Sequence, residues 1–173
     1  SHGGGGLTPL LGDLRASVIS QGWHWIDIDP FGSPVPFLDT AMQALARRGI
    51  LEVSATDTAA LSGSSPNPLM RRYGARVRLD KLKHDSGLRV LLATVARAAA
   101  RHDRSIEPLL SIWDSHHLRV SVRVLRIMSG ANDLEASLGW RVFTPTKTEV
   151  EASVAAGLLP EDSEKALPIR CFL

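Results

Sequence analysis

The 173-residue sequence contains a single cysteine, Cys171, which excludes an internal disulfide framework and a zinc site built only from cysteines. It also lacks an apolar run of about 20 residues, because Arg89 and Arg97 interrupt its most apolar stretch, so no membrane-spanning helix is expected. The first residues have neither the basic region nor the apolar region of a secretory signal, and residues 1–11 are interpreted as a flexible, glycine-rich leader. Together these absences favour a reducing, cytoplasmic location.

Charge is nearly balanced over the whole chain, at +2, but it is unevenly distributed. Residues 71–104 carry ten basic side chains against three acids, whereas residues 133–165 carry seven acids against three bases. A basic segment of this kind can attract phosphates, and it can equally be the solvated face of a helix next to a basic loop. The ten basic residues are Arg71, Arg72, Arg76, Arg78, Lys81, Lys83, Arg89, Arg97, Arg101 and Arg104.

Hydrophobic periodicity predicts strands that alternate with helices. Strands are expected at 23–28, 50–55, 109–113 and 118–124, the last from strict alternation of apolar and polar residues. Helical spacing of apolar residues predicts a helix over 37–45, ended by Gly49, and a longer one over 88–101. Residues 62–68 are expected to form a loop, and 146–157 a short helix. This order indicates an α/β fold with parallel strand pairs and an antiparallel edge.

The segment Asp29-Pro30-Phe31-Gly32-Ser33-Pro34 lies between the first expected strand and the first expected helix. Ligands of open α/β sheets bind outside the carboxyl ends of strands, so this turn is a candidate site. A carboxylate there can accept hydrogen bonds from an exocyclic amino group and draw the nitrogen lone pair out of conjugation. Proline leaves its carbonyl as a second acceptor, and Phe31 offers a face for stacking. The alternative is an ordinary turn that caps a helix.

The longer string Ile26–Asp39, which includes this turn, closely resembles the tRNA guanine-26 N2-dimethyltransferases. Three further blocks match that family in the same order, and a looser block, His84-Asp85 with Leu88-Arg89, has aspartate where the family has glutamate. The resemblance covers residues 12–124. The three ordered blocks are Thr56–Ala59 with Leu61 and Gly63, Arg72–Gly74, and Ile106–Ser111.

The resemblance implies a Rossmann-like class I methyltransferase fold, S-adenosylmethionine as methyl donor and tRNA as substrate. It implies that Asp29 holds and activates the guanine amino group and that Phe31 helps to enclose the base. The Pro30 carbonyl is expected to hold the amino group together with Asp29. Asp13 and Leu14 would correspond to the segment that contacts the adenine of the donor. On this basis residues 12–128 are a partial catalytic core, and residues 129–173 begin a C-terminal region.

The sequence also departs from the family pattern. The glycine-rich donor loop and the acid that grips the ribose belong to a part of the family upstream of anything in this sequence, and the glycine leader does not replace that loop. Ser115-His116-His117 stands where the family has Asp-His-Tyr, and the zinc-binding cysteines of many relatives are missing. The chain is therefore expected to supply the second half of the catalytic domain, without the N-terminal donor-binding strands, and to need that missing half as a partner.

Other residues have a functional and a structural interpretation. Arg71, Arg72, Tyr73 and Arg76 are the expected contacts to the tRNA backbone. Asp27 is a candidate for proton transfer, Asp57 for lining the cleft, and the pair His116 and His117 for metal binding. The alternatives are a capping or hydrogen-bonding role for each aspartate and polar positions at the start of a strand for the two histidines.

Two other classes of function stay open from the residues alone. The first is an amino-methyltransferase that acts on a DNA base or a protein amide, since those enzymes also use a turn with an acid, a proline and an aromatic residue. The second is a non-catalytic RNA-binding fragment, or an inactive relative, that does not bind the donor by itself.

Overall fold

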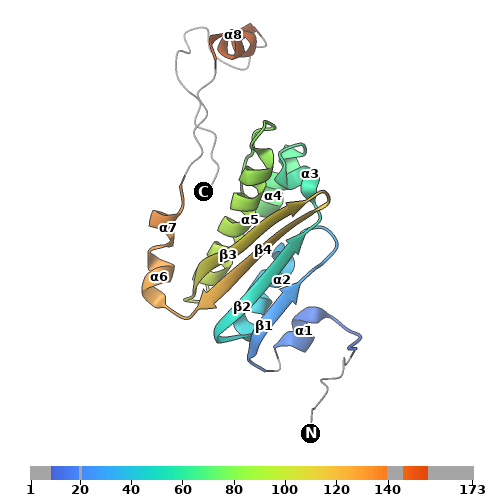
Figure 1. The fold of residues 1–173 in the computed structure, drawn as a ribbon, viewed down its shortest axis with the longest axis vertical. Helices are drawn as coiled ribbons and strands as arrows, with labels where there is room; N and C mark the ends of the chain where they lie inside the picture. Colours follow the sequence, from blue (N-terminus) through green and yellow to red (C-terminus); the bar gives the residue numbers. More distant parts are fainter. Residues whose placement is uncertain (1–8, 20, 140–145, 156–173) are drawn as a thin grey trace.

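A four-stranded sheet forms the centre of the computed structural model, which describes residues 9–19, 21–139 and 146–155 (Figure 1). Its strands are β1 (Trp23–Ile28), β2 (Leu45–Ala55), β3 (Ser105–Asp114) and β4 (His117–Leu125). They lie in the order β1-β2-β4-β3, with β1 parallel to β2 and with β4 antiparallel to both of its neighbours. The expected α/β fold with an antiparallel edge is confirmed.

Strand direction brings three strand ends together at one edge of the sheet. Because β3 and β2 each run antiparallel to β4, they run in the same direction as each other, and β1 runs with them. The carboxyl ends of β1, β2 and β3 therefore meet where β4 begins, with Ala55 opposite Leu118 and Asp114 opposite His117. In an open α/β sheet this is the edge at which ligands bind.

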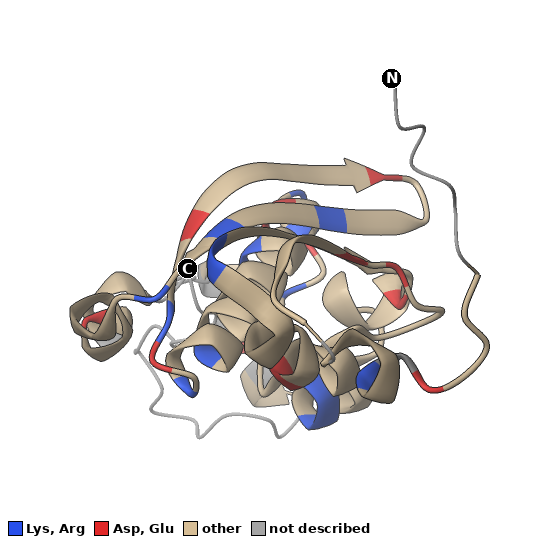
Figure 2. Ribbon diagram, turned by 90° about the horizontal axis from the view of Figure 1, so that it is seen from below, with Lys and Arg blue, Asp and Glu red and all other residues tan. Residues whose placement is uncertain are grey.

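The main helices cover one face of the sheet, which lies above them in the view of Figure 2. Helix α2 provides the crossover that the parallel β1–β2 pair requires, and α5 packs against β3, β4 and α2. Within the described residues, no helix is both long and apolar enough to cross a bilayer. The helices are α1 (Leu14–Val18), α2 (Val35–Ala44), α3 (Thr58–Leu61), α4 (Pro66–Tyr73), α5 (Lys83–Ala100), α6 (Met128–Asn132), α7 (Leu134–Ser137) and α8 (Lys147–Ala155).

The core lies between the sheet and these helices, and the spacing of apolar residues along the sequence explains which side chains it buries. Alternate residues of β4 point into the core, so the even-numbered positions from Leu118 to Val124 are fully buried. Leu91, Val95 and Ala99 form the matching stripe of α5 and are also fully buried. The polar residues between the buried positions of β4 lie on the opposite face, which the helices leave uncovered.

Several boundaries differ from the sequence prediction: β2 begins at Leu45, five residues before the strand expected at 50–55, and β3 begins at Ser105, four residues before the strand expected at 109–113. Gly49 does not end a helix, because α2 ends at Ala44 and Gly49 lies inside β2, where a Cβ atom would come within 3.2 Å of the His24 carbonyl oxygen. The expected loop at 62–68 ends early, since Pro66 begins α4 and proline is well suited to a first helical turn. The expected helix at 146–157 is present as α8, and the last two residues of that range lie outside the described residues. Residues 1–8 of the expected leader also lie outside them.

Candidate functional site

Two hydrogen bonds between Gly32 and Thr56 attach the turn after β1 to the end of β2. The Gly32 N–H donates to Thr56 Oγ1 at 2.6 Å, and the Thr56 N–H donates back to the Gly32 carbonyl at 3.0 Å. Gly32 has a φ of +84°, which favours glycine at this position. The turn is thus held at the carboxyl edge of the sheet, with Asp29 exposed at the end of β1 and Phe31 fully exposed beside it.

Asp29 lines a hollow of about 280 Å³ at this edge. Its volume is close to the lower limit for pockets that bind small molecules, about 300 Å³. The lining contains two carboxylates, one arginine and one histidine, and Ile112 is its apolar side chain. The lining residues are Asp29, Ser54, Ile112, Asp114, His117 and Arg119.

Arg119 is held in this hollow by contacts to two neighbouring strands. Its Nη1 donates to Ser54 Oγ at 2.9 Å, its Nη2 donates to Asp27 Oδ2 at 2.8 Å, and its Nε lies 3.4 Å from Glu52 Oε2. The hydrogen bond that Arg119 donates to Asp27 is the main reason that the pKa of Arg119 lies above its ordinary value, and Asp29 adds a smaller electrostatic contribution. Asp27 therefore pairs with Arg119 in this structure.

Asp57 takes part in a second cluster, which joins the end of β2 to α4. Its side chain is only 8 % exposed and accepts hydrogen bonds from the Tyr73 hydroxyl at 2.7 and 2.9 Å and from Arg72 Nη1 at 3.2 Å. Burial raises the pKa of the Tyr73 phenol, which keeps it protonated and able to donate. Tyr73, expected among the RNA contacts, is 4 % exposed, and it supports α4 from inside the protein.

The other expected RNA contacts lie on the helical side of the molecule, where Figure 2 shows basic positions on the helices. Arg71 and Arg72 are exposed in the last turn of α4, and Arg76 is exposed just beyond it. Arg104 differs from the rest of the basic segment, because it is 8 % exposed and donates to the Leu45 and Ala46 carbonyls at 2.7 and 2.9 Å. Part of the basic segment is therefore structural.

Asp13 and Leu14, the expected donor-binding residues, lie at the start of α1. The Asp13 carboxylate accepts from the Arg15 N–H at 2.9 Å and pairs with the Arg15 guanidinium at 2.6 Å. The side-chain hydrogen bond from Arg15 is the main cause that lowers the pKa of Asp13 to about 2. Asp13 is thus ionised at neutral pH and caps the helix, and neither residue lines the hollow at Asp29.

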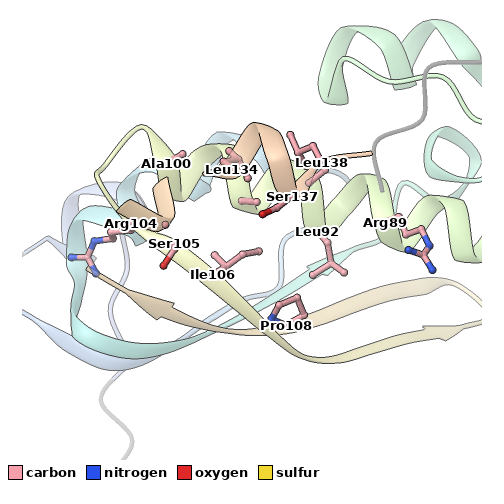
Figure 3. A pocket seen from close by; sticks show the side chains of 13 residues that line it. Arg89, Leu92, Ala100, Arg104, Ser105, Ile106, Pro108, Leu134, Ser137 and Leu138 are labelled. Carbon is pink, nitrogen blue, oxygen red and sulfur yellow. The ribbon is translucent and has the colours of Figure 1, made fainter. Parts of the chain in front are cut away.

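A second hollow, of about 310 Å³, lies between α5, the first half of β3 and the α6–α7 segment (Figure 3). Its walls are mainly apolar, with Leu92, Ile106 and Leu138 among the residues that line it, and Arg89 and Arg104 stand at its two ends. None of the expected catalytic, donor-binding or RNA-binding residues lines this hollow.

Several lining residues of the first hollow were not singled out from the sequence. Ser54, Asp114 and Arg119 come from three different strands, and only the strand order brings them next to Asp29. The alternation of 118–124 was a usable signal for Arg119, because it places that residue on the face away from the core. His117 begins β4, and the described residues contain no group of three or more potential ligands that could hold a metal ion.

The fold is that of a Rossmann-like methyltransferase, as comparison with a solved structure shows. The complex structure of Trm1 from Pyrococcus horikoshii with S-adenosyl-L-methionine matches with a TM-score of 0.74 and 32% sequence identity, over 92% of this chain and 43% of that chain.

Sequence comparisons identify the family within this class. A family model described as N2,N2-dimethylguanosine tRNA methyltransferase matches residues 13–154, and the chain belongs to this family. The tRNA (guanine(26)-N(2))-dimethyltransferase of Thermoplasma acidophilum is 40% identical over 137 residues, which are 79% of this chain and 40% of that protein. The enzyme of the same name from Thermoplasma volcanium is 45% identical over 118 residues, 68% of this chain and 34% of that protein. The chain thus spans well under half the length of these relatives.

Proposed function

We propose that this chain carries the base-binding part of an S-adenosylmethionine-dependent enzyme that methylates the exocyclic N2 of a tRNA guanine, at position 26 as in the named relatives. The observation that carries the proposal is the position of Asp29: a carboxylate exposed at the carboxyl edge of the sheet, in a hollow of about 280 Å³. A target guanosine would leave the base stack to reach this hollow.

The residues of the turn have separate roles in the proposed reaction. Asp29 accepts hydrogen bonds from the N2 amino group, which directs the nitrogen lone pair out of the plane of the base, and it can take the proton that the nitrogen releases. The Pro30 carbonyl is a second acceptor, and the fully exposed ring of Phe31 is available to stack on the base. Placement and exclusion of water then supply most of the rate acceleration.

S-adenosylmethionine, when bound, supplies an electrophilic methyl group on a sulfonium. Asp13 and Leu14 would contact its adenine, and the ionised Asp13 carboxylate has the acceptor chemistry that an adenine amino group requires. These two residues provide only part of a donor site. We therefore expect this chain alone to bind the donor weakly, and the N-terminal half of the same enzyme to supply the glycine-rich loop and the acid that holds the ribose.

The tRNA backbone would lie along α4 and the residues after it. Arg71, Arg72 and Arg76 are exposed there, and Asp57 and Tyr73 fix the end of the helix that presents Arg72. Binding should weaken as salt is raised, because cations on a nucleic acid are released when arginines replace them. By this proposal the enzyme works in the cytoplasm, in keeping with its single cysteine.

Analysis of the methylated nucleoside tests the proposal. The natural full-length protein is incubated with tRNA and labelled donor, the tRNA is digested, and the product is identified. We expect N2-methylated guanosine, and label on any other nucleoside, or tRNA that stays unlabelled, would contradict the proposal. Reversal of charge at Arg71 and Arg72 should weaken tRNA binding and its salt dependence; unchanged affinity would exclude α4 as the contact surface.

A further inference from the structure

Arg119 has no role in the proposed methyl transfer, yet it lines the same hollow as Asp29. Three side chains from β1 and β2 fix its guanidinium: Ser54 and Asp27 each accept one hydrogen bond, and Glu52 forms an ion pair with it. An arginine held in this way loses little conformational freedom when it binds a ligand. The hollow therefore presents a fixed positive group and the Asp29 carboxylate to the same occupant.

The donors of Arg119 are not all used by these contacts. A guanidinium carries five N–H donors, and within the described residues the three contacts above account for one donor on each nitrogen. One N–H on each Nη therefore has no acceptor within the described residues, and Arg119 lines the hollow. Two such donors in a planar fork match two neighbouring acceptors on a ligand.

Guanine has the complementary arrangement of polar groups. Its N1–H and N2 amino group are donors, which suit Asp29, whereas O6 and N7 are neighbouring acceptors, which suit an arginine fork. Adenine has an amino group in place of O6, so it would face the Arg119 donors with a donor of its own. The pair of side chains therefore favours guanine over adenine in this hollow.

We propose that Arg119 reads O6 and N7 of the target guanine while Asp29 holds N2, and that Arg119 thereby determines the base specificity of the site; this assignment rests on the proposed function. A bidentate contact of this kind discriminates between bases by about 5- to 150-fold. Asp27, Glu52 and Ser54 act through Arg119 as positioning residues.

The test uses a tRNA with 2-aminopurine in place of the target guanine, because this base keeps the 2-amino group and N7 but lacks O6. It also lacks the N1–H, a change that affects the wild type and the variant alike and so cancels when their ratios are compared. Single-turnover methyl transfer to both tRNAs is measured for the natural full-length protein and for Arg119→Ala. We expect the variant to lose its rate mainly on guanine, so that its guanine-to-2-aminopurine ratio falls fivefold or more. A smaller fall, or a variant that keeps the wild-type rate on guanine, would overturn the assignment. Both rates come from one protein preparation, so partial unfolding cancels in the ratio.

Two further variants separate base reading from folding. Arg119→Lys keeps the charge beside Asp27 and Glu52 but lacks the fork, so it should show the same loss of discrimination as Arg119→Ala; a wild-type ratio would contradict the assignment. Arg123→Ala removes an arginine from the same face of β4, where it pairs with Glu107 at 2.6 Å away from the hollow, and should leave the ratio unchanged. If the wild-type protein methylates neither tRNA, the proposed function fails; if it methylates guanine and the ratio is insensitive to Arg119, only this assignment fails.

Discussion

Replacement of Tyr73 by phenylalanine tests how α4 is attached to the sheet. The substitution removes one hydroxyl group and keeps the ring, which is 4 % exposed. That hydroxyl donates to both oxygens of the Asp57 carboxylate, at 2.7 and 2.9 Å, and the carboxylate is itself 8 % exposed. After the substitution, Arg72 is the remaining side-chain donor to Asp57 in the described structure, at 3.2 Å.

The expected cost follows from the charge and burial of the acceptor. A hydrogen bond to a charged group contributes about 1.5–3 kcal/mol, and removal of the donor leaves a buried carboxylate poorly satisfied. We therefore expect Tyr73→Phe to lower the free energy of unfolding by about 2 kcal/mol. For a chain of this length the melting temperature should fall by about 4–8 °C.

Urea and thermal unfolding of the 173-residue chain measure this effect. Arg72→Met is the matched control, because it removes the other donor to the same carboxylate from a side chain that is 46 % exposed. Because the Arg72 guanidinium remains partly in water and its contact to Asp57 is long, at 3.2 Å, we expect its loss to cost about 1 kcal/mol or less. A loss below about 0.5 kcal/mol for Tyr73→Phe, or equal losses for the two variants, would refute the reasoning that the buried hydroxyl fixes α4.

Two further stability predictions follow from close packing and from a buried charge. Gly63→Ala should lower the free energy of unfolding by about 3 kcal/mol or more, because at a φ of +83° its Cβ would overlap the Val77 carbonyl. Gly32→Ala, at a φ of +84° in open space, should lower it by about 1–2 kcal/mol, and equal losses in urea unfolding would exclude the clash at Gly63. Arg104→Met should cost about 2–4 kcal/mol, since it strips two carbonyls of their side-chain donor, and a melting temperature within 2 °C of wild type would contradict this role.

The fold was largely predictable because its main helices and strands have a clear hydrophobic periodicity in the sequence. The alternation of β4 and the apolar stripe of α5 each identify an element and its buried face from local sequence. The boundary at Gly49 was not predictable in this way, since the glycine serves a close approach to β1 that only the assembled sheet creates. Helix stops that rest on one residue type fail when tertiary packing has another use for that residue.

The candidate site was predictable at Asp29 and less so elsewhere. A carboxylate that directly follows a strand lies at the sheet edge whatever the rest of the fold, and the structure places Asp29 there. Arg119 acquires its partners from strands about 65 and 92 residues away in sequence, so its position depends on the strand order. Arg104 shows the converse case. From the sequence it counts as one more residue of the basic segment, but its hydrogen bonds to carbonyls about 58 residues away in sequence give it a structural role.

The most direct test of the central claim is the rate of methyl transfer to tRNA by Asp29→Ala in the natural full-length protein, measured beside its affinity for the same tRNA. The account predicts that transfer is abolished while affinity changes by less than about threefold, since none of the exposed arginines of α4 lines the hollow at Asp29. Turnover that persists in this variant at a rate near that of the wild type would contradict it.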